Sequence, residues 1–176
     1  MPVNQTISTL TARRSCRNFN PAKVPSTDDL NVILNAGIYA PSGMGKQPVK
    51  IIAVTNKELR DKISAENAKI MGVDSDPFYG APVILIVIAD KTSGTYLYDG
   101  SLVMGNLLNA AESLGINSIW IHRAKEEFES DFGKKILKDL GIEGDWEGIG
   151  HVALGYANEG GVNAAAPRKD NIHWVK

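Results

Sequence analysis

The chain has little cysteine and no long apolar run. Its only cysteine, Cys16, cannot form a disulfide within the chain and argues against a metal site built from several thiolates. The longest apolar run, residues 83–89, is too short to span a bilayer, and the N-terminus lacks the charged and apolar stretches of a signal peptide. These absences predict a cytoplasmic protein that does not enter the membrane.

The chain also lacks an excess of either charge. Lysine and arginine number 19 and aspartate and glutamate number 20, which gives a net charge of −1. This balance provides no long-range positive field to attract nucleic acid or an anionic membrane. No repeat, linker or low-complexity tract divides the 176 residues, so we expect a single domain over residues 1–176.

Several common functional motifs are missing as well. No Gly-x-Gly-x-x-Gly follows a strand-like run and no Gly-x-Ser-x-Gly occurs, although composition alone does not exclude a Ser-His-Asp triad. Residues 43–46 look like a phosphate-binding loop, but Ala40 and Gln47 stand where that motif needs Gly and Ser or Thr. The three histidines show no metal-ligand spacing: His122, His151 and His173.

A basic cluster near the N-terminus is the first positive feature. Arg13, Arg14 and Arg17 surround Ser15 in the run Arg-Arg-Ser-Cys-Arg-Asn-Phe. Guanidinium groups beside a hydroxyl suit a phosphate or an electron-rich ring edge. Near the other end, Arg168 and Lys169 follow a proline. Because the overall charge is close to neutral, these clusters favour a small anionic ligand over a polymer.

A loop at residues 40–48 is the second positive feature. It lies between the predicted end of a helix and the start of a strand. Gly43 and Gly45 permit close approach of the backbone to a ligand, while Ser42 and Gln47 offer hydrogen-bonding groups. The sequence thus predicts a binding site assembled from distant segments.

The hydrophobic pattern predicts an α+β fold with a mixed central sheet flanked by helices on both faces. The helix from 99 to 114 is apolar over so wide an arc that we expect a second subunit to cover part of it. The exposed ring of Trp174 in a C-terminal arm also needs a covering surface. The other predicted helices cover 5–12, 26–40, 56–71 and 125–139, and the predicted strands cover 49–55, 83–88, 117–121, 149–156 and 172–175.

In these segments the chain resembles the nitroreductase family of flavin enzymes from about residue 10 onward. The family's first motif, Arg-(Arg/His)-Ser-x-Arg/Lys-x-Phe, is matched from Arg13 to Phe19. Its second motif, Ala-Pro-Ser-(Ala/Gly)-x-Asn-x-Gln-Pro-Trp, is matched by Ala40, Pro41, Ser42, Gly43, Gln47 and Pro48. The later regions follow in the family's order: Asp99 and Asn106, Leu114-Gly115-Ile116, Trp120-Ile121, Gly155-Tyr156 and Pro167-Arg168-Lys169.

The resemblance implies a homodimer that exchanges its C-terminal arms and binds FMN at two subunit interfaces. It implies that Arg17 lies along the N1 and O2 edge of the flavin, where a fixed cation raises the reduction potential. The other residues implied at the phosphate and ribityl end are Arg13, Arg14, Ser15, Arg168 and Lys169. Those implied on the partner's loop are Pro41, Ser42, Gly43 and Gln47, and those implied near N5 and O4 are Ile121, His122 and Arg123.

The activity implied by the resemblance is a ping-pong transfer of hydride from NADH or NADPH through flavin N5. The acceptor would be a nitroaromatic, a quinone or a similar small molecule, and no side chain need act as acid or base in the hydride steps. Two alternatives stay open. One is an FMN enzyme of the same fold with other chemistry, such as reductive dehalogenation or flavin or azoline oxidation, and the other is a non-catalytic flavin-binding protein.

The chain departs from the family pattern at two motif positions and in one loop. Gly45 replaces an asparagine, so we expect the 40–48 loop to contact the cofactor mainly through its backbone. Val49 replaces a tryptophan at a sheet position, where we expect the change to affect packing. The short segment 71–80, where longer members insert a helical excursion, is expected to leave the substrate side open. Two residues have plainer interpretations: Cys16 as a filler of the interior and Asp99 as a helix cap.

Overall fold

The computed structural model describes residues 4–166, 169 and 171–176. A four-stranded sheet lies at the centre, in the order β1-β2-β4-β3. All three neighbouring pairs are antiparallel, and the parallel pairing in the described chain is one isolated bridge between Ser15 and Ser118. The mixed character predicted for the sheet is therefore limited to that bridge. The strands are β1 (Val49–Val54), β2 (Val83–Asp90), β3 (Asn117–Ile121) and β4 (Trp146–Gly155).

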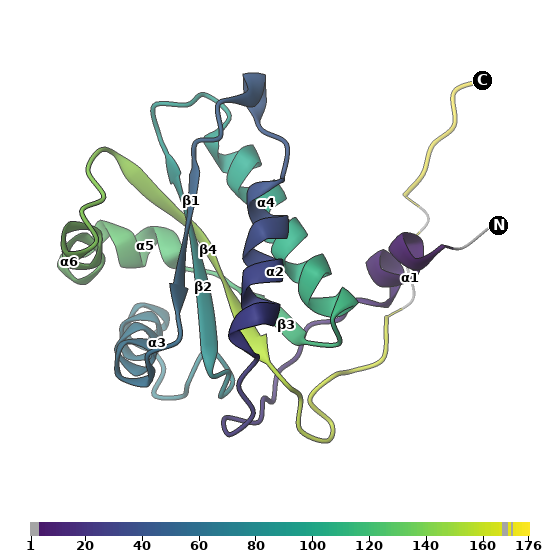
Figure 1. Cartoon of the computed structure of the whole chain (residues 1–176), viewed down its shortest axis with the longest axis horizontal. Coiled ribbons are helices and arrows are strands. Elements are labelled where there is room, and N and C mark those ends of the chain that lie inside the picture. Colours follow the sequence, from purple (N-terminus) through teal and green to yellow (C-terminus); the bar gives the residue numbers. More distant parts are fainter. Residues whose placement is uncertain (1–3, 167–168, 170) are drawn as a thin grey trace.

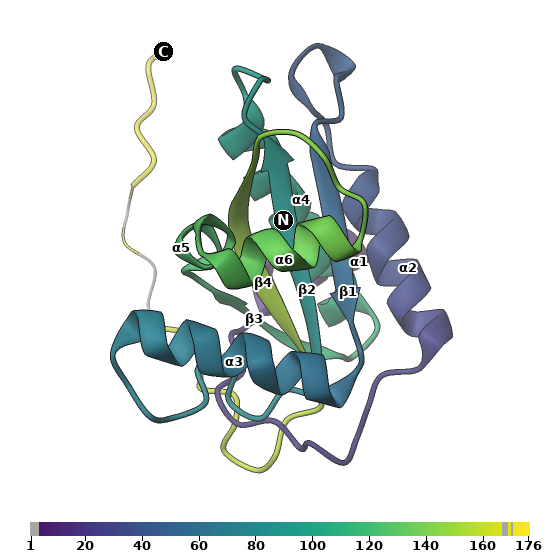
Figure 2. The same cartoon turned by 90° about the vertical axis from the view of Figure 1, so that its left-hand side faces the viewer.

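Helices cover both faces of the sheet, which confirms the predicted α+β class. Figures 1 and 2 show α3, α5 and α6 on one face and α2 and α4 on the other, with α1 beyond α4. A one-turn helix, η1, follows α2 at the end of the molecule farthest from the turn between α1 and α2. The helices are α1 (Gln5–Ala12), α2 (Thr27–Ile38), η1 (Gly43–Gly45), α3 (Lys57–Met71), α4 (Tyr96–Ser113), α5 (Ala124–Glu129) and α6 (Asp131–Asp139).

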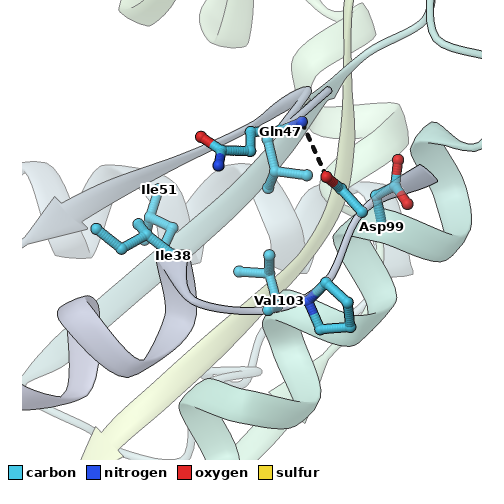
Figure 3. Close-up of a pocket in the computed structure, with 9 residues that line it drawn as sticks. Ile38, Gln47, Ile51, Asp99 and Val103 are labelled. Carbon is cyan, nitrogen blue, oxygen red and sulfur yellow. Dashed lines mark hydrogen bonds between the residues drawn. The ribbon is translucent and has the colours of Figure 1, made fainter. Parts of the chain in front are cut away.

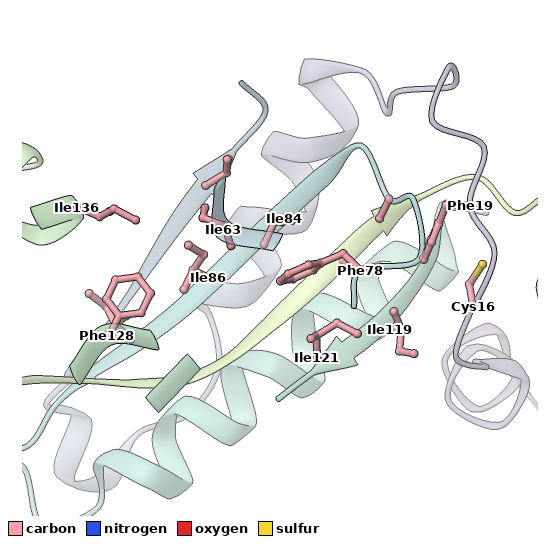
Figure 4. Packing of buried hydrophobic residues seen from close by; sticks show 14 of the residues in the cluster. Cys16, Phe19, Ile63, Phe78, Ile84, Ile86, Ile119, Ile121, Phe128 and Ile136 are labelled. Atoms are coloured by element: carbon pink, nitrogen blue, oxygen red, sulfur yellow. The ribbon is translucent and has the colours of Figure 1, made fainter. Parts of the chain in front are cut away.

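Strand β2 is buried from Val83 to Ala89, as its unbroken apolar run predicts for a central strand. Side chains alternate between the faces of a strand, so this run supplies two separate cores. Ile84, Ile86 and Ile88 pack with Phe78 and with residues of α3, α5 and α6 (Figure 4). The intervening side chains pack against α2 and α4: Val83, Leu85, Val87 and Ala89.

Helix starts agree closely with the predicted caps. The Ser26 hydroxyl accepts a hydrogen bond from the Asp29 N–H and donates to the Asp29 carboxylate, which forms the predicted start of α2. Asn56 accepts from the Leu59 N–H at 2.9 Å and begins α3. Helix α4 begins three residues earlier than predicted, at Tyr96 rather than residue 99.

The single helix predicted over 125–139 is wrong, because Ser130 divides it into α5 and α6. Ser130 has extended backbone geometry, with φ −75° and ψ 162°. Its hydroxyl donates to the Glu127 carbonyl at 2.6 Å and accepts from the Gly133 N–H at 3.3 Å. The side chain therefore ends one helix and begins the next, a local competition with the helical hydrogen bonds that apolar periodicity does not reveal.

The short strand predicted over 172–175 is also wrong for the isolated chain. Residues 171–176 have no regular secondary structure, and the ring of Trp174 is 80% exposed. Figures 1 and 2 show this C-terminal arm leading away from the body of the molecule. A strand needs a neighbouring strand for its N–H and C=O groups, and this chain places none beside the described part of the arm.

Candidate functional site

The segment that contains the first motif is fixed to the sheet by its backbone. The Cys16 N–H donates to the Ser118 carbonyl at 3.0 Å, and the Arg17 N–H donates to the Gly161 carbonyl at 2.8 Å. Cys16 and Phe19 are buried in the core, whereas Arg17 is exposed. Burial raises the pKa of the Cys16 thiol, which agrees with a packing role. The two buried neighbours therefore hold Arg17 outward.

The rest of the basic cluster lies at the end of α1. Arg13 is the C-terminal cap residue and is partly exposed. Arg14 Nη1 donates to the carbonyls of Thr11 at 2.7 Å and Arg13 at 2.8 Å, which gives it a local role at the helix end. Ser15 forms the bridge to β3. The binding roles of Arg13, Arg14 and Ser15 stay predictions.

A pocket of about 280 Å3 lies along β3, and we call it the β3 pocket. It brings Arg17 together with the strand end at residues 121–123, two segments more than 100 residues apart in the sequence. Met71 and Tyr79 from the short 71–80 segment also line it. The lining includes Arg17, Asp76, Tyr79, Ile121, His122 and Arg123.

Asp76 is the carboxylate that lines the β3 pocket, and its charge is already compensated. Its oxygens accept hydrogen bonds from the Ser64 hydroxyl, the Arg60 guanidinium and the N–H groups of Phe78 and Gly80. Desolvation acts to raise the pKa of Asp76, but these hydrogen bonds outweigh it and the pKa lies below its ordinary value. The uncompensated charges on the pocket wall are therefore basic.

Arg123 is held in an unusual conformation at the end of β3. Its φ is 74°, a left-handed value that costs a residue with a Cβ free energy. Its Nε donates to Oδ1 of Asn67 at 3.0 Å, and Asn67 Nδ2 donates to the His122 carbonyl at 3.1 Å. Helix α5, which follows, packs tightly on β4, because a Cβ on Gly148 would lie 2.1 Å from the Ala124 carbonyl oxygen. The strand end is thus fixed from two sides.

A buried ionisable pair lies behind this strand end. Glu127 and His151 are fully buried, and His151 Nε2 lies 3.2 Å from Glu127 Oε2. Asn67, also fully buried, approaches the same Oε2 at 3.5 Å. The Phe78 ring meets the His151 imidazole edge-on, with 5.2 Å between ring centroids. Asn67 therefore connects the pair to Arg123 at the pocket wall.

The 40–48 loop lines a second pocket of about 240 Å3, which we call the loop pocket (Figure 3). The Gly43 N–H donates to Asp99 Oδ1 at 2.9 Å, and the Gln47 N–H donates to the Ser42 hydroxyl at 2.9 Å. Asp99 is buried, and its other oxygen accepts from the Thr95 hydroxyl. Asp99 thus anchors the loop to α4 in addition to lying in the first turn of that helix. The lining residues from the second motif are Ala40, Pro41, Ser42 and Gln47.

Left-handed backbone geometry recurs in this loop. Met44, Gly45 and Gln47 have φ values of 54°, 65° and 49°. A Cβ on Gly45 would meet nothing within 4 Å, so the side chain missing from the family's asparagine position would have pointed into open space. The Met44 side chain is 84% exposed. The loop is shaped by its backbone, and much of its surface has no neighbour within the chain.

The two pockets lie far apart in one chain. Figures 1 and 2 place η1 and the 40–48 loop at one end of the molecule and the segment after α1 at the opposite end. Lys169, in the C-terminal arm, is exposed, and Arg168 lies outside the described residues. One chain therefore joins Arg17 to residues 121–123 but does not join either to Pro41, Ser42, Gly43 or Gln47.

The polar groups behind the β3 pocket were missed by the sequence analysis. Asn67 lies in the middle of a helix, and no spacing rule connects it to residues 123, 127 or 151. Among the described residues, no group of three or more His, Cys, Asp or Glu side chains lies close enough to hold a metal ion. The sequence signal that could have revealed the pair is Glu127, a charged residue beside the apolar Phe128 in the predicted helix. A carboxylate buried at such a position needs a hydrogen-bonding or ionic partner.

Comparison with known proteins identifies the family of the chain. The nitroreductase family profile matches residues 10–77. Two relatives are each 31% identical to the chain, one from Methanothermobacter thermautotrophicus and one from Archaeoglobus fulgidus. Their names assign them, without proof of activity, as NADH dehydrogenase/NAD(P)H nitroreductases. The matches cover 65% and 84% of this chain and 59% and 82% of those proteins.

A solved structure of a nitroreductase is similar to this chain over nearly its full length. The crystal structure of a nitroreductase with bound FMN from Bacteroides fragilis is 32% identical, with a TM-score of 0.87 over 99% of this chain and 100% of that one. Among the described helices of our chain, none has the length and apolar character needed to cross a membrane. With the family motifs, the fold and full-length similarity in agreement, the chain belongs to the nitroreductase family.

Proposed function

We propose that the chain is an FMN-dependent oxidoreductase that works as a homodimer, with one composite site at each end of the subunit interface. The observation that carries the proposal is the separation of the two pockets within one chain. Both are lined by family motifs, yet neither is complete. A second copy related by a two-fold axis can bring its 40–48 loop to the β3 pocket of the first, and the reverse contact follows by symmetry.

The donor groups of the β3 pocket fit FMN. The cofactor combines a phosphate dianion, ribityl hydroxyls and a ring edge of carbonyl and imine acceptors. The pocket offers guanidinium groups, a compensated carboxylate and the backbone of residues 121–123. When bound, FMN would supply the redox chemistry, by accepting a hydride from NADH or NADPH and passing two electrons to a nitroaromatic, quinone or similar acceptor.

The residues of this chain would divide the binding work. Arg17 would hold the pyrimidine edge of the ring, where a fixed cation favours the reduced form. The backbone of Ile121, His122 and Arg123 would face the N5 and O4 side. The phosphate and ribityl end would be held by Arg13, Arg14, Ser15, Arg168 and Lys169, and the loop of the second copy would contribute Pro41, Ser42, Gly43 and Gln47.

Exposed apolar side chains support the dimer. Tyr98 and Leu102 on α4 are 74% and 46% exposed, and Ile38 and Tyr39 at the end of α2 are 62% and 78% exposed. Trp174 in the arm is exposed as well. Patches of this kind are uncommon on monomers, so we propose that α2, α4 and an exchanged arm form the subunit interface.

The proposal is tested with the purified protein. Bound FMN, a dimeric mass in sedimentation, and oxidation of NADH or NADPH with nitrofurazone or menadione are expected. A protein that stays colourless after incubation with FMN contradicts the proposal. A yellow protein that is inert toward both nicotinamides favours the other FMN chemistries. A protein that binds FMN but shows no steady-state turnover favours a non-catalytic flavin-binding protein.

Two variants test the division of roles. Arg13→Ala is expected to weaken FMN binding by roughly tenfold to a hundredfold, the effect of one charge-assisted hydrogen bond to phosphate. Arg17→Ala is expected to lower the FMN reduction potential and to slow reduction by on the order of tenfold or more, with a smaller loss of affinity. Equal losses of FMN affinity, with no change of potential in either variant, would contradict this division.

A further inference from the structure

Arg123 is held in place more firmly than its proposed backbone role requires. Contacts through the backbone near N5 and O4 could be made by glycine, which adopts a φ of 74° without strain. The guanidinium forms no side-chain cap with α5, although Arg123 is the residue that begins that helix. Strain at a non-glycine residue persists where the surrounding structure enforces it, and such residues cluster at functional sites.

Asn67 fixes the direction of the guanidinium. Within the described residues, the side-chain hydrogen bond of Arg123 is the one from Nε to Asn67 Oδ1 at 3.0 Å. Asn67 cannot move aside easily, because it is fully buried and also donates to the His122 carbonyl. The bond through Nε leaves the terminal N–H groups of Arg123 available to a ligand in the β3 pocket.

In the part of the chain that the structure describes, Arg123 has no carboxylate partner. Asp76, the carboxylate in the lining of the β3 pocket, is engaged by Arg60, Ser64 and two backbone N–H groups. Neither Arg17 nor Arg123 forms an ion pair with a described residue. The wall of the pocket thus presents two guanidinium groups and the exposed His122.

We propose that Arg123 is a specificity-determining residue that binds an anionic group, such as a carboxylate, on the electron acceptor, and that Asn67 is the positioning residue that aims it. This inference rests on the proposed function, in which Arg13 and Arg168 hold the cofactor phosphate and Arg17 holds the ring edge. Arg123 is then the cation left for the substrate. A guanidinium is suited to a carboxylate because its N–H groups match both oxygens.

The test compares two acceptors that differ in charge. With the FMN-loaded dimer, kcat/KM is measured for para-nitrobenzoate and for its neutral isostere para-nitrobenzamide, in the wild type, Arg123→Gln and Arg123→Lys. We expect the benzoate-to-benzamide ratio to fall about tenfold or more in Arg123→Gln and less in Arg123→Lys, which keeps the charge. An effect on the cofactor cancels in this ratio. An unchanged ratio in Arg123→Gln overturns the proposal.

A binding measurement makes the result independent of turnover. Benzoate and benzamide are titrated into the oxidised protein by calorimetry, and benzoate is expected to bind about tenfold more tightly, with the difference lost in Arg123→Gln. Equal affinities in the wild type would overturn the proposal. A protein without FMN or without NAD(P)H oxidation contradicts the proposed function instead, and the same titration in that protein still decides the role of Arg123.

The positioning role of Asn67 is tested by a double-mutant cycle. Asn67→Ala keeps the guanidinium but removes its anchor, so the benzoate-to-benzamide ratio is expected to fall part of the way. Adding Asn67→Ala to Arg123→Gln is then expected to change the ratio no further, because the anchored group is already absent. Independent, additive effects on the ratio would show that Asn67 does not act through Arg123.

Discussion

The β3 pocket and the loop pocket differ in the groups that hold their walls. Behind the β3 pocket, Asn67, Glu127 and His151 are fully buried and connect the strand end to the core. The loop pocket depends on one buried carboxylate, Asp99, and on backbone turns whose outer surface is exposed. A wall fixed by the core is organised before a ligand arrives, whereas an exposed loop can adjust when a partner surface covers it.

This difference suits the division of the proposed site. The chain that binds the redox ring would need a wall of fixed charges and dipoles, since electrostatic control of a cofactor depends on groups that do not reorganise. The loop donated to the other subunit would need to fit a surface formed by assembly. Mutations at the two walls can therefore show whether the pockets depend on such different supports.

Removal of one member of the buried pair is expected to have the largest effect. Glu127→Leu leaves His151 without its partner in the interior and should lower the free energy of unfolding by about 3–5 kcal/mol. Replacing both residues, as Glu127→Leu with His151→Leu, should recover most of that loss, because no unpaired polar group remains. Urea denaturation of the wild type, the two single variants and the double variant measures both values. A loss below about 1 kcal/mol in Glu127→Leu would mean that the pair does not support the β3 pocket.

Asp76 is expected to give a pH-dependent effect of intermediate size. Its pKa in the folded chain lies below the ordinary value of 3.8, so its carboxylate stabilises the fold at neutral pH, and that contribution is lost as the pH falls through the folded pKa. Asp76→Asn should therefore lower the free energy of unfolding by on the order of 2 kcal/mol near pH 7, with a smaller difference from wild type near pH 3.

Thermal unfolding between these pH values measures the difference. The matched control is Asp90→Asn, because the partly buried Asp90 carboxylate accepts hydrogen bonds from Thr92 alone among the described residues. Those bonds also lower the pKa of Asp90, so a pH-dependent difference of the same sign but smaller size is expected in the control. A difference between Asp76→Asn and wild type that grows on acidification would contradict the assigned role.

The sequence predicted the fold and the grouping of Arg17 with residues 121–123 for identifiable physical reasons. Caps such as Ser26 and Asn56 act within one turn, and the apolar run of β2 is a local pattern, so both were read correctly. Arg17 and residues 121–123 were assigned by family motifs, and the fold brings them into one pocket. Asn67 escaped that reasoning, and Asp99 was interpreted as a helix cap although Thr95 is the cap residue of α4 and Asp99 anchors the loop. In both cases the hydrogen-bond partner lies 56 residues away in the sequence. The break at Ser130 escaped it because one hydroxyl, rather than periodicity, divides the helix.

A substitution in the loop pocket is expected to lower the free energy of unfolding by less than the two changes above. A Cβ on Gly43 would lie 2.3 Å from the Thr95 Oγ1, so Gly43→Ala must displace either the loop or the Thr95 side chain. Because the loop is largely exposed, we expect a loss of stability of only about 1 kcal/mol, together with weaker FMN retention by the dimer. Gly94→Ala is the matched control, since a Cβ there meets nothing within 4 Å. Equal FMN retention in the two variants would remove the loop from the composite site.

An effect of similar size is expected from the backbone strain at Arg123. Arg123→Ala and Arg123→Gly both remove the guanidinium and its bond to Asn67, so in the folded chain they differ in the cost of a φ of 74°. Glycine loses more backbone freedom on folding, which offsets part of that difference. The glycine variant should be more stable than the alanine variant by about 1 kcal/mol, because a residue without a Cβ adopts this conformation freely. Denaturant midpoints at a shared m-value measure the difference. If alanine were the more stable of the two, the backbone of the β3 pocket would carry no strain, and the firm support described for that wall would rest on the buried polar groups alone.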